Sequence, residues 1–254
     1  QGGKVPELTE DAIKTFKENC KEYGIKNVYV HTPYFINLAS INNKIYYGSI
    51  SAIKKELERA SALGAKYVMT HLGSAKDLGE KESLEKVING LEKVFEGYNG
   101  TTKLLIENSA GAGKIIGADF KQIGKILKAF APMSDFEIRS PTSGLVGVCL
   151  DTQHSFASGY NWKSSEGGPV SGWNALKKDI GIENVRLIHA NDSAAEAGSH
   201  KDRHEHIGKG KIGLEAFAKI VDLAKEYNID MICETDYPGV VEDIKVLKNL
   251  RNNA

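Results

Sequence analysis

Five of the seven histidines of this chain lie at the expected ends of strands or in the loops that follow them, close to carboxylates or glycines. The densest stretch is His189-Ala-Asn-Asp192, followed by Asp202-Arg-His204-Glu-His206. The apolar run Val185–Ile188 leads directly into His189, so we expect this imidazole at the edge of a sheet. Because neutral imidazole and carboxylate side by side are the ligands that divalent metals prefer, the pattern predicts an active site with more than one metal ion.

Six short apolar runs are predicted to be strands, and each ends in a residue that can bind a metal ion. The runs are Asn27–His31, Lys66–His71, Lys103–Glu107, Leu145–Asp151, Val185–His189 and Asp230–Glu234. The carboxyl ends of parallel strands in a barrel meet at one face, where the active site lies, so the six ligands would converge there. Unpaired buried carboxylates are costly, which indicates that cations neutralise them.

Amphipathic helices are expected between the strands, because apolar residues recur there at every third or fourth position. The expected buried faces are Ile50, Ile53 and Leu57; Leu84, Val87, Ile88 and Leu91; Phe120, Ile123, Ile126, Leu127 and Phe130; Leu214, Phe217, Ile220 and Val221; and Ile244, Leu247 and Leu250. Thr9 is the expected start of the first helix and Gly24 its end. The alternation predicts an α/β fold with a parallel sheet.

A TIM-type (β/α)8 barrel needs eight strands, whereas about six are visible in this sequence. The chain also begins at Gln1 without an initiator methionine. We therefore expect that an N-terminal β-α-β portion of the barrel is absent, rather than that the barrel is an unusual incomplete one. No linker or repeat divides the sequence, so residues 1–254 are expected to form one domain.

The composition limits the classes of function. Lys+Arg and Asp+Glu both number 33, so any binding of a polyanion must come from a local patch or from bound metal. The three cysteines show no CxxC spacing, and no run approaches the ~18 apolar residues of a membrane span. We expect a protein of the reducing cytoplasm that does not bind membranes.

Three further residues extend the set of ligands. His154 follows Asp151 at i+3, and Asp202 and His204 are two apart, so in an extended segment they share a face. Nine ligands exceed the capacity of one ion and indicate a cluster of two or three. Ligation rich in histidine favours Zn²⁺, with Mn²⁺ or Fe²⁺ as substitutes. Metal ions a few Å apart clamp the attacking and leaving oxygens of a phosphodiester, so hydrolysis of that bond is the leading chemistry.

Two other patterns are interpreted as structural. His200 and His206 are expected to face solvent or to lie outside the ligand set. The stretch Gly208–Gly213 fits GxGxxG, but no strand precedes it, so we expect a tight turn that leads into the helix at Leu214 rather than a dinucleotide site.

The chain resembles the endonuclease IV family, the zinc-dependent apurinic/apyrimidinic endonucleases (AP endonuclease family 2). The resemblance covers nearly the whole chain, apart from the family's N-terminal β-α-β segment. It is carried by His31-Thr-Pro-Tyr34-Phe-Ile-Asn-Leu38, Thr70-His71-Leu-Gly-Ser74, Ile106-Glu107-Asn-Ser-Ala-Gly111, Cys149-Leu-Asp151-Thr-Gln-His154, His189-Ala-Asn-Asp192, Asp202-Arg-His204-Glu-His-Ile-Gly208 and Glu234-Thr235. Gln153 departs from the cysteine that many relatives have there, which should not disturb the ligands.

The resemblance implies a TIM barrel with three zinc ions. In this scheme His31, His71 and Glu107 hold the first; Glu107 bridges to the second, which Asp151, His189 and Glu234 also hold; and His154, Asp202 and His204 hold the third. A zinc-bound hydroxide would attack the phosphate 5′ to an abasic deoxyribose and leave a 3′-hydroxyl, with Glu107 or Glu234 as the catalytic carboxylate. Removal of 3′ blocking groups would use the same cluster.

The resemblance also implies the partner. The substrate would be double-stranded DNA with abasic sites, and Tyr34 and Phe35 would enter the DNA at the lesion and unstack a base step. Packing of these two rings beneath their own loop is the alternative. A monomer is expected, associated with the nucleoid in a bacterium or archaeon.

Two other functions compete with this one. A sugar isomerase or epimerase of related barrel fold needs only one or two metals, and Glu107, Asp151, His189 and Glu234 would satisfy it. It leaves His31, His71, His154, Asp202 and His204 without a role. The other alternative is a metal-stabilised protein that binds damaged DNA without cutting it.

Overall fold

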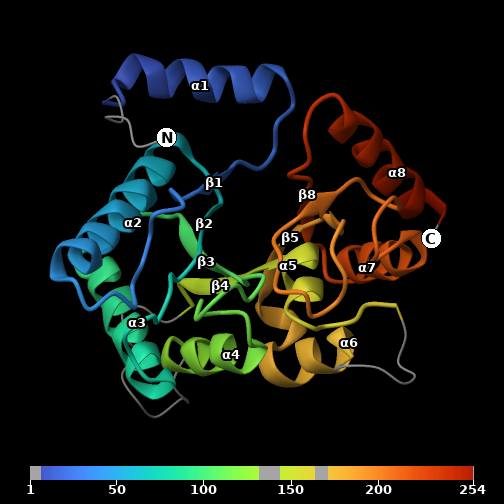
Figure 1. Cartoon of the computed structure of the whole chain (residues 1–254). Helices are drawn as coiled ribbons and strands as arrows, with labels where there is room; N and C mark the ends of the chain where they lie inside the picture. Colours follow the sequence, from blue (N-terminus) through green and yellow to red (C-terminus); the bar gives the residue numbers. More distant parts are fainter. Residues whose placement is uncertain (1–6, 132–143, 164–170, 254) are drawn as a thin grey trace, which may run out of the picture. The chain divides into compact units, whose positions relative to one another are not determined.

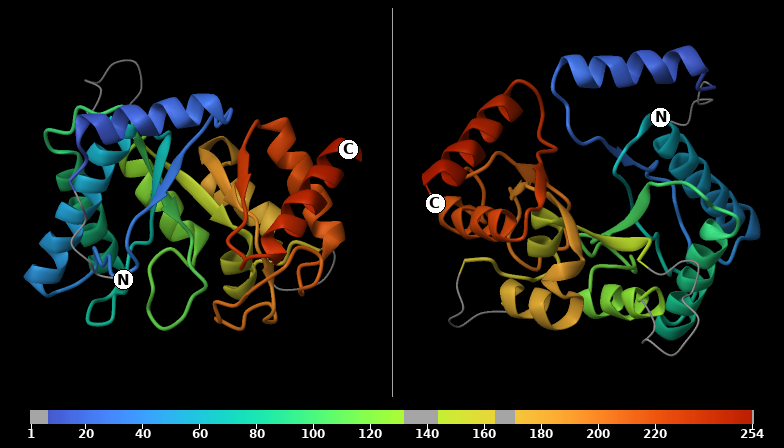
Figure 2. Two further views of the ribbon diagram at one scale, coloured as in Figure 1. Left: turned by 90° about the horizontal axis from the view of Figure 1, so that it is seen from above. Right: turned by 180° about the vertical axis from the view of Figure 1, so that it is seen from behind.

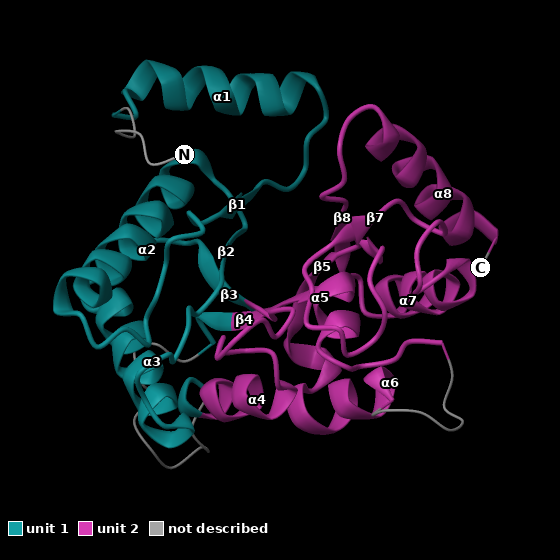
Figure 3. Cartoon of the chain, in the orientation of Figure 1, with its two compact units in different colours: residues 1–106, 129–146 teal, residues 107–128, 147–254 magenta. Residues whose placement is uncertain are grey.

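The computed structural model describes residues 7–131, 144–163 and 171–253, in which strands alternate with helices (Figures 1 and 2). It divides into two compact units, coloured separately in Figure 3. Unit 1 comprises residues 1–106 and 129–146, and unit 2 comprises residues 107–128 and 147–254. No helix of the described ranges is both long and apolar enough to cross a membrane.

Unit 1 contains three parallel strands in the order β1-β2-β3. Its elements are α1 (Glu10–Glu22), β1 (Tyr29–His31), α2 (Asn43–Leu63), β2 (Tyr67–Thr70), α3 (Glu80–Phe95) and β3 (Lys103–Glu107), whose last residue belongs to unit 2. Helices α2 and α3 lie side by side in Figures 1 and 2. Leu104, Leu105 and Ile106 of β3 are fully buried, as expected for a parallel strand that is covered on both faces.

Unit 2 contains three further parallel strands in the order β4-β5-β8. Its elements are α4 (Phe120–Ala129, whose last residue belongs to unit 1), β4 (Val146–Asp151, whose first residue does), α5 (Thr152–Ala157), α6 (Gly172–Ala175) with a π-helical turn (Leu176–Ile180) and a 3-10 turn (Ile182–Asn184), β5 (Val185–His189), β6 (Asp192–Ser193), β7 (His204–Glu205), α7 (Leu214–Glu226), β8 (Asp230–Ile232) and α8 (Gly239–Asn253). Strands β6 and β7 form a short antiparallel pair.

The six predicted strands all form, but two end earlier than expected. Strand β2 ends at Thr70 and β8 ends at Ile232, so His71 and Glu234 lie just beyond their strands. The helix starts follow local chemistry, because the Thr9 hydroxyl accepts a hydrogen bond from the N–H of Ala12 and caps α1. Gly24, with a φ of 65°, follows this helix, as predicted.

Helix α8 buries its predicted apolar residues less than expected. Ile244 is 43% exposed and Leu247 and Leu250 are only half-buried, whereas the buried residue of this helix is Asp243. Leu214, the first residue of α7, is likewise 48% exposed. Leu247 and Leu250 follow Asp243 at i+4 and i+7 and so lie on its face of the helix, whereas Ile244 lies beside that face. Apolar spacing therefore missed the most buried residue of α8, a carboxylate with several hydrogen-bond donors around it.

Candidate metal centre

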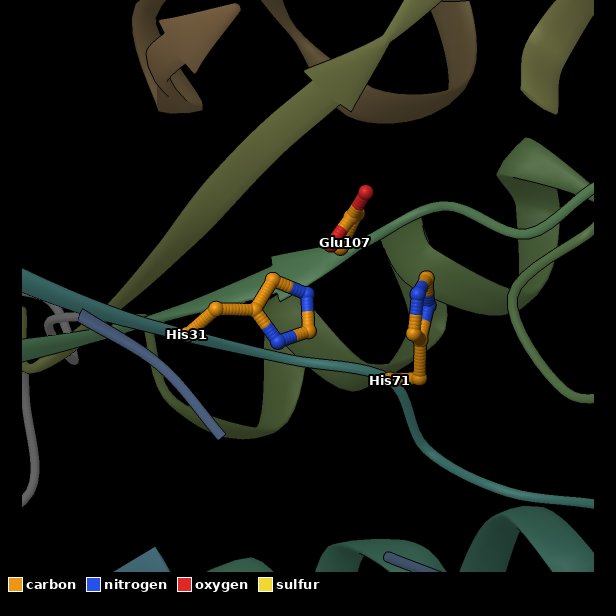
Figure 4. A group of neighbouring side chains, drawn as sticks. All are labelled: His31, His71 and Glu107. Carbon is orange, nitrogen blue, oxygen red and sulfur yellow. The ribbon is translucent and has the colours of Figure 1, made fainter. Parts of the chain in front are cut away.

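His31, His71 and Glu107 form the first group of potential ligands (Figure 4). His31 ends β1, His71 directly follows β2 and Glu107 ends β3, at the point where this strand passes into unit 2. One ligand atom from each residue lies within 4.8 Å of the others. The two imidazole rings are tilted, with their centroids 5.4 Å apart. Successive parallel strands therefore deliver these side chains together, as the sequence predicts.

A main-chain contact orients His31. Its Nδ1 lies 2.7 Å from the carbonyl oxygen of Thr32 and donates a hydrogen bond to it, so Nε2 carries the lone pair that a metal ion could bind. The Thr32 N–H donates to the Met69 carbonyl at 2.9 Å, and the Thr32 hydroxyl donates to the Thr70 hydroxyl at 2.8 Å. These bonds join the ends of β1 and β2 beside the two histidines.

The second group lies wholly in unit 2 and consists of Glu107, Asp151, His189 and Glu234. The Nδ1 atom of His189 is 3.0 Å from Glu107 Oε1 and 3.1 Å from Glu234 Oε2. Glu107, Asp151 and His189 are almost fully buried, whereas the Glu234 side chain is 33% exposed. Three carboxylates around one imidazole carry an excess of negative charge that a divalent cation would balance.

Two asparagines that we did not predict hold this second group. Asn191 donates through Nδ2 to Asp151 Oδ2 at 2.7 Å and to Glu234 Oε2 at 3.2 Å, and its Oδ1 accepts the Glu234 N–H at 2.9 Å. Asn108 is bound to the Asp151 main chain through both its amide atoms, at 2.8 and 3.0 Å. The sequence offers one sign of these roles, because Asn108 directly follows Glu107 and Asn191 follows His189 by two residues.

The third group is Asp151, His154 and His204, with Asp202 beside it. Asp151 Oδ1 caps α5 by accepting the His154 N–H at 2.7 Å, so the i+3 spacing spans the first turn of a helix. Asp202 lies 3.4 Å from Nε2 of His154 and 3.4 Å from Nε2 of His204. Eight of the nine predicted ligands thus belong to the three groups, and the ninth, Asp202, lies beside the third.

The GxGxxG stretch has a structural explanation within unit 2. The buried carboxylate of Asp192 accepts main-chain N–H groups from Gly208, Gly210, Ile212 and Gly213, at 2.9 to 3.4 Å. A Cβ atom on Gly210 would lie 2.4 Å from Asp192 Oδ1, which explains the glycine there. The predicted turn before the helix at Leu214 is confirmed, and the donors that a phosphate would need are already bound to a carboxylate of the chain.

The electrostatics of the second and third groups favour protonated histidines in the absence of metal. Burial alone would lower the pKa of His189, but Cys149, Glu107 and Glu234 raise it far above its usual value. Burial likewise opposes a charge on His154, yet Asp151, and after it Asp202 and Glu107, raise its pKa well above 6.5. A metal ion would have to displace these protons.

The Cys149 thiol belongs to the core rather than to the ligand set. It is fully buried, and burial raises its pKa to about 12. At neutral pH the thiol is therefore protonated and poorly reactive.

The residues present fit a divalent metal ion. Within the described residues, the buried Nε2 atom of His204 forms no hydrogen bond, so this atom is available as a ligand. Two ligands at ~2.1 Å from one tetrahedral ion are ~3.4 Å apart, and Asp202 lies at 3.4 Å from each of its two histidines. Imidazoles mixed with carboxylates suit Zn²⁺, Mn²⁺ and Fe²⁺ better than Mg²⁺ or Ca²⁺.

The other residues singled out in the sequence lie outside the three groups. Tyr34 is 82% exposed and Phe35 is 52% exposed, so neither ring is buried beneath its loop. His200 is exposed, and His206 binds Asp243 rather than a ligand. Sequence reasoning missed Arg203, an exposed cation between the two potential ligands Asp202 and His204, although its place in that motif was visible.

A family model described as xylose isomerase-like TIM barrel matches residues 1–250. The chain is 35% identical over 253 residues to the probable endonuclease 4 of Cenarchaeum symbiosum, which covers 99% of this chain and 86% of that protein. It is 36% identical over 239 residues to the probable endonuclease 4 of Aquifex aeolicus, which covers 89% of this chain and 80% of that protein.

Solved structures give the same fold. The chain is similar to endonuclease IV from Thermus thermophilus, with 26% identity, a TM-score of 0.81 and coverage of 99% of this chain and 85% of that one. It is similar in fold to a D-tagatose 3-epimerase-like protein, with 21% identity, a TM-score of 0.71 and coverage of 97% and 85%. The predicted fold class, an α/β TIM-type barrel, is confirmed by these matches.

Proposed function

The chain belongs to the endonuclease IV family, and on that premise we propose that it is a metal-dependent phosphodiesterase that cleaves DNA 5′ to abasic sites and leaves a 3′-hydroxyl. The main support for the proposal is that two carboxylates each belong to two ligand groups. Glu107 belongs to the first and second groups, and Asp151 belongs to the second and third. Shared carboxylates are what hold several metal ions a few Å apart, the spacing that phosphodiester hydrolysis needs. Removal of 3′ blocking groups would require the same residues.

The ligands would divide among three ions, for which zinc suits the donors best. His31, His71 and Glu107 would hold the first ion, and Asp151, His189 and Glu234 would hold the second together with Glu107. His154, Asp202 and His204 would hold the third. When bound, such ions supply a hydroxide nucleophile near neutral pH and positive charge for the phosphate oxygens.

Glu234 is better placed than Glu107 to accept a proton from a water molecule. Its side chain is 33% exposed, whereas that of Glu107 is 1% exposed. The hydrogen bond with His189 lowers the pKa of Glu234 despite partial burial, so the carboxylate is ionised at neutral pH and available as an acceptor. Asn191 orients it through a hydrogen bond of 3.2 Å. Glu107, which is buried against His189, would serve chiefly as a ligand.

Exposed side chains supply contacts for DNA. Tyr34 and Phe35 project from the loop that follows the ligand His31, and base stacking on exposed aromatic rings tolerates any sequence. Lys201, Arg203 and Lys209 are exposed cations around the ligands Asp202 and His204 in unit 2. They provide the local positive charge that binding of a phosphate backbone requires in a chain of zero net charge.

A sugar epimerase remains the second candidate, because the group Glu107, Asp151, His189 and Glu234 would suffice for it. Its support is weaker. The epimerase-like match at 21% identity speaks for the fold alone, whereas the probable endonucleases 4 match at 35 and 36% identity. An epimerase would also leave the buried Nε2 of His204, which forms no hydrogen bond within the described residues, without use.

The test joins metal analysis to an incision assay. The purified chain is analysed for bound metal, and a duplex with one abasic site is incubated with it beside an intact duplex of the same sequence. We expect ~3 zinc ions per chain, one for each ligand group, and cleavage 5′ to the lesion only. A single bound metal with epimerisation of a ketose and no incision would refute the proposal.

A further inference from the structure

The segment 201–207, here called the ligand loop, carries two potential ligands with little regular structure around them. Only His204 and Glu205 lie in a strand, the two-residue β7. The Asp202 side chain is 60% exposed, so burial does not fix its position. Yet it faces both His154 and His204 at 3.4 Å, and contacts outside the ligand pair must maintain that geometry.

Gln153 holds the beginning of the ligand loop. It is fully buried in α5, between Asp151 and His154, and its Nε2 donates to the Lys201 carbonyl at 2.9 Å and to the Ser193 hydroxyl at 3.4 Å. Among the described residues, no donor contacts its buried Oε1 atom. A buried carbonyl oxygen without a hydrogen bond lowers the stability of the fold. We therefore attribute the role of Gln153 to its hydrogen bond with the loop and not to its packing in the core.

Asp243 holds the end of the ligand loop. This carboxylate on α8 is 2% exposed and is the buried residue of that helix. It accepts hydrogen bonds from His206 Nδ1 at 2.8 Å and from the Ile207 N–H at 2.9 Å. It also accepts the Thr235 hydroxyl at 2.5 Å, directly beside the potential ligand Glu234.

The middle of the loop is bound to strand β6 and the residue that follows it. Ser193 pairs with His204, and the Ala194 N–H donates to the Arg203 carbonyl at 3.0 Å. These main-chain bonds set the register of the loop but do not fix its two ends. The two side chains on α5 and α8 act at those ends.

We propose that Gln153 and Asp243 are positioning residues for the third metal ion, holding the two ends of the ligand loop so that Asp202 and His204 face His154. The inference rests on the metal centre of the proposed function. Neither residue belongs to a ligand group, so each acts through the main chain or through a neighbour of a ligand. Outer partners of this kind commonly change metal affinity ~10–100-fold, a typical magnitude for such contacts.

The test compares Gln153→Leu and Asp243→Asn with the wild-type chain and with Glu242→Gln. Glu242 is the exposed neighbour of Asp243 on α8 and pairs with Lys245 at the surface, which makes it a matched control. Zinc is titrated into the metal-free chain against a chromogenic chelator, and the Tm of each variant is measured with and without zinc. We expect the Kd of one ion to rise ~10–100-fold in both variants, with the other ions and Glu242→Gln unchanged.

The metal-free Tm separates positioning from simple stabilisation. Gln153→Leu removes the unpartnered carbonyl, so its metal-free Tm should stay equal to that of the wild type or rise, while its stabilisation by zinc falls. Unchanged affinity for every ion, or equal weakening of all ions together with a lower metal-free Tm, would overturn the inference. Should Asp243→Asn fail to fold, Gln153→Leu decides the matter alone. Absence of incision by a wild-type chain with full metal content would instead refute the proposed function.

Discussion

The histidines of unit 1 and those of unit 2 are held in different ways. His31 is exposed and His71 is half-buried, and His31 is oriented by a main-chain carbonyl. His154 and His189 are buried and contact several carboxylates. The comparison teaches that potential ligands can be held in different ways, His31 by a main-chain carbonyl and the buried imidazoles of unit 2 by carboxylates around them.

The largest expected effect comes from Glu107, the carboxylate common to the first and second ligand groups. Glu107→Ala should lower incision at least ~1,000-fold, which corresponds to ~4 kcal/mol of lost stabilisation of the transition state. It should also lower zinc content, measured by elemental analysis. Full activity in this variant would show that the two groups do not depend on a common ligand. Glu85→Ala, an exposed carboxylate on α3, is the control.

The next largest expected effect is the pH dependence of zinc affinity, which should arise from the buried histidines of unit 2. The pKa values of His154 and His189 are raised in the metal-free chain, so both carry protons at neutral pH and zinc must displace them. Because the two histidines would hold different ions, the affinity of each of these two ions should increase with pH by up to ~10-fold per pH unit, and the product of the two by up to ~100-fold. Calorimetry in buffers of different ionisation enthalpy measures the protons released, and release of none would contradict the prediction.

The same raised pKa values predict the opposite trend for the stability of the metal-free chain. Protonation of His154 and His189 favours the folded state fully below the unfolded pKa of ~6.5, and this stability is lost as the pH rises through the raised folded values. Thermal melts with and without zinc should thus change in opposite directions between pH 6 and 8, taken as ~1 unit either side of neutrality. Parallel trends would show that the buried histidines are neutral.

Asn191 offers a smaller and more local test of unit 2. Asn191→Ala removes the hydrogen bonds to Asp151 and Glu234, so zinc affinity should fall ~10–100-fold. Thr32→Val is the counterpart in unit 1, and its effect should be smaller because the Thr32 hydroxyl binds Thr70 and not an imidazole. Chelator competition compares the two variants, and a larger loss in Thr32→Val would reverse the contrast between the units.

The smallest expected effect concerns Tyr34, which lies in unit 1 beyond the ligand His31. Tyr34→Ala should weaken binding of abasic DNA ~10-fold through lost stacking while leaving zinc content intact. Fluorescence anisotropy with a labelled duplex measures the affinity. Tyr23→Ala, at an exposed tyrosine beside α1, should leave it unchanged. Loss of zinc in Tyr34→Ala would show instead that the ring supports the metal site.

Much of the site could be predicted from the sequence, because it depends on short-range patterns. Alternating apolar runs placed His31, Glu107, Asp151 and His189 at strand ends, and parallel strands bring their carboxyl ends to a common edge. The capping of α5 by Asp151 follows the same local logic. Residue types and spacing therefore determined which side chains could bind metal, and the family resemblance predicted how they would divide among ions.

Only the tertiary structure decided what holds those ligands. Asn191 binds Asp151 across 40 positions of sequence, and Gln153 reaches Lys201 across 48. Apolar periodicity also missed Asp243, the buried residue of α8, because it takes no account of the hydrogen-bond donors that make this buried carboxylate favourable. Local sequence patterns indicate which faces of helices and strands are buried. Hydrogen bonds between distant segments depend on the packing that brings those segments together, and that packing is a property of the folded chain.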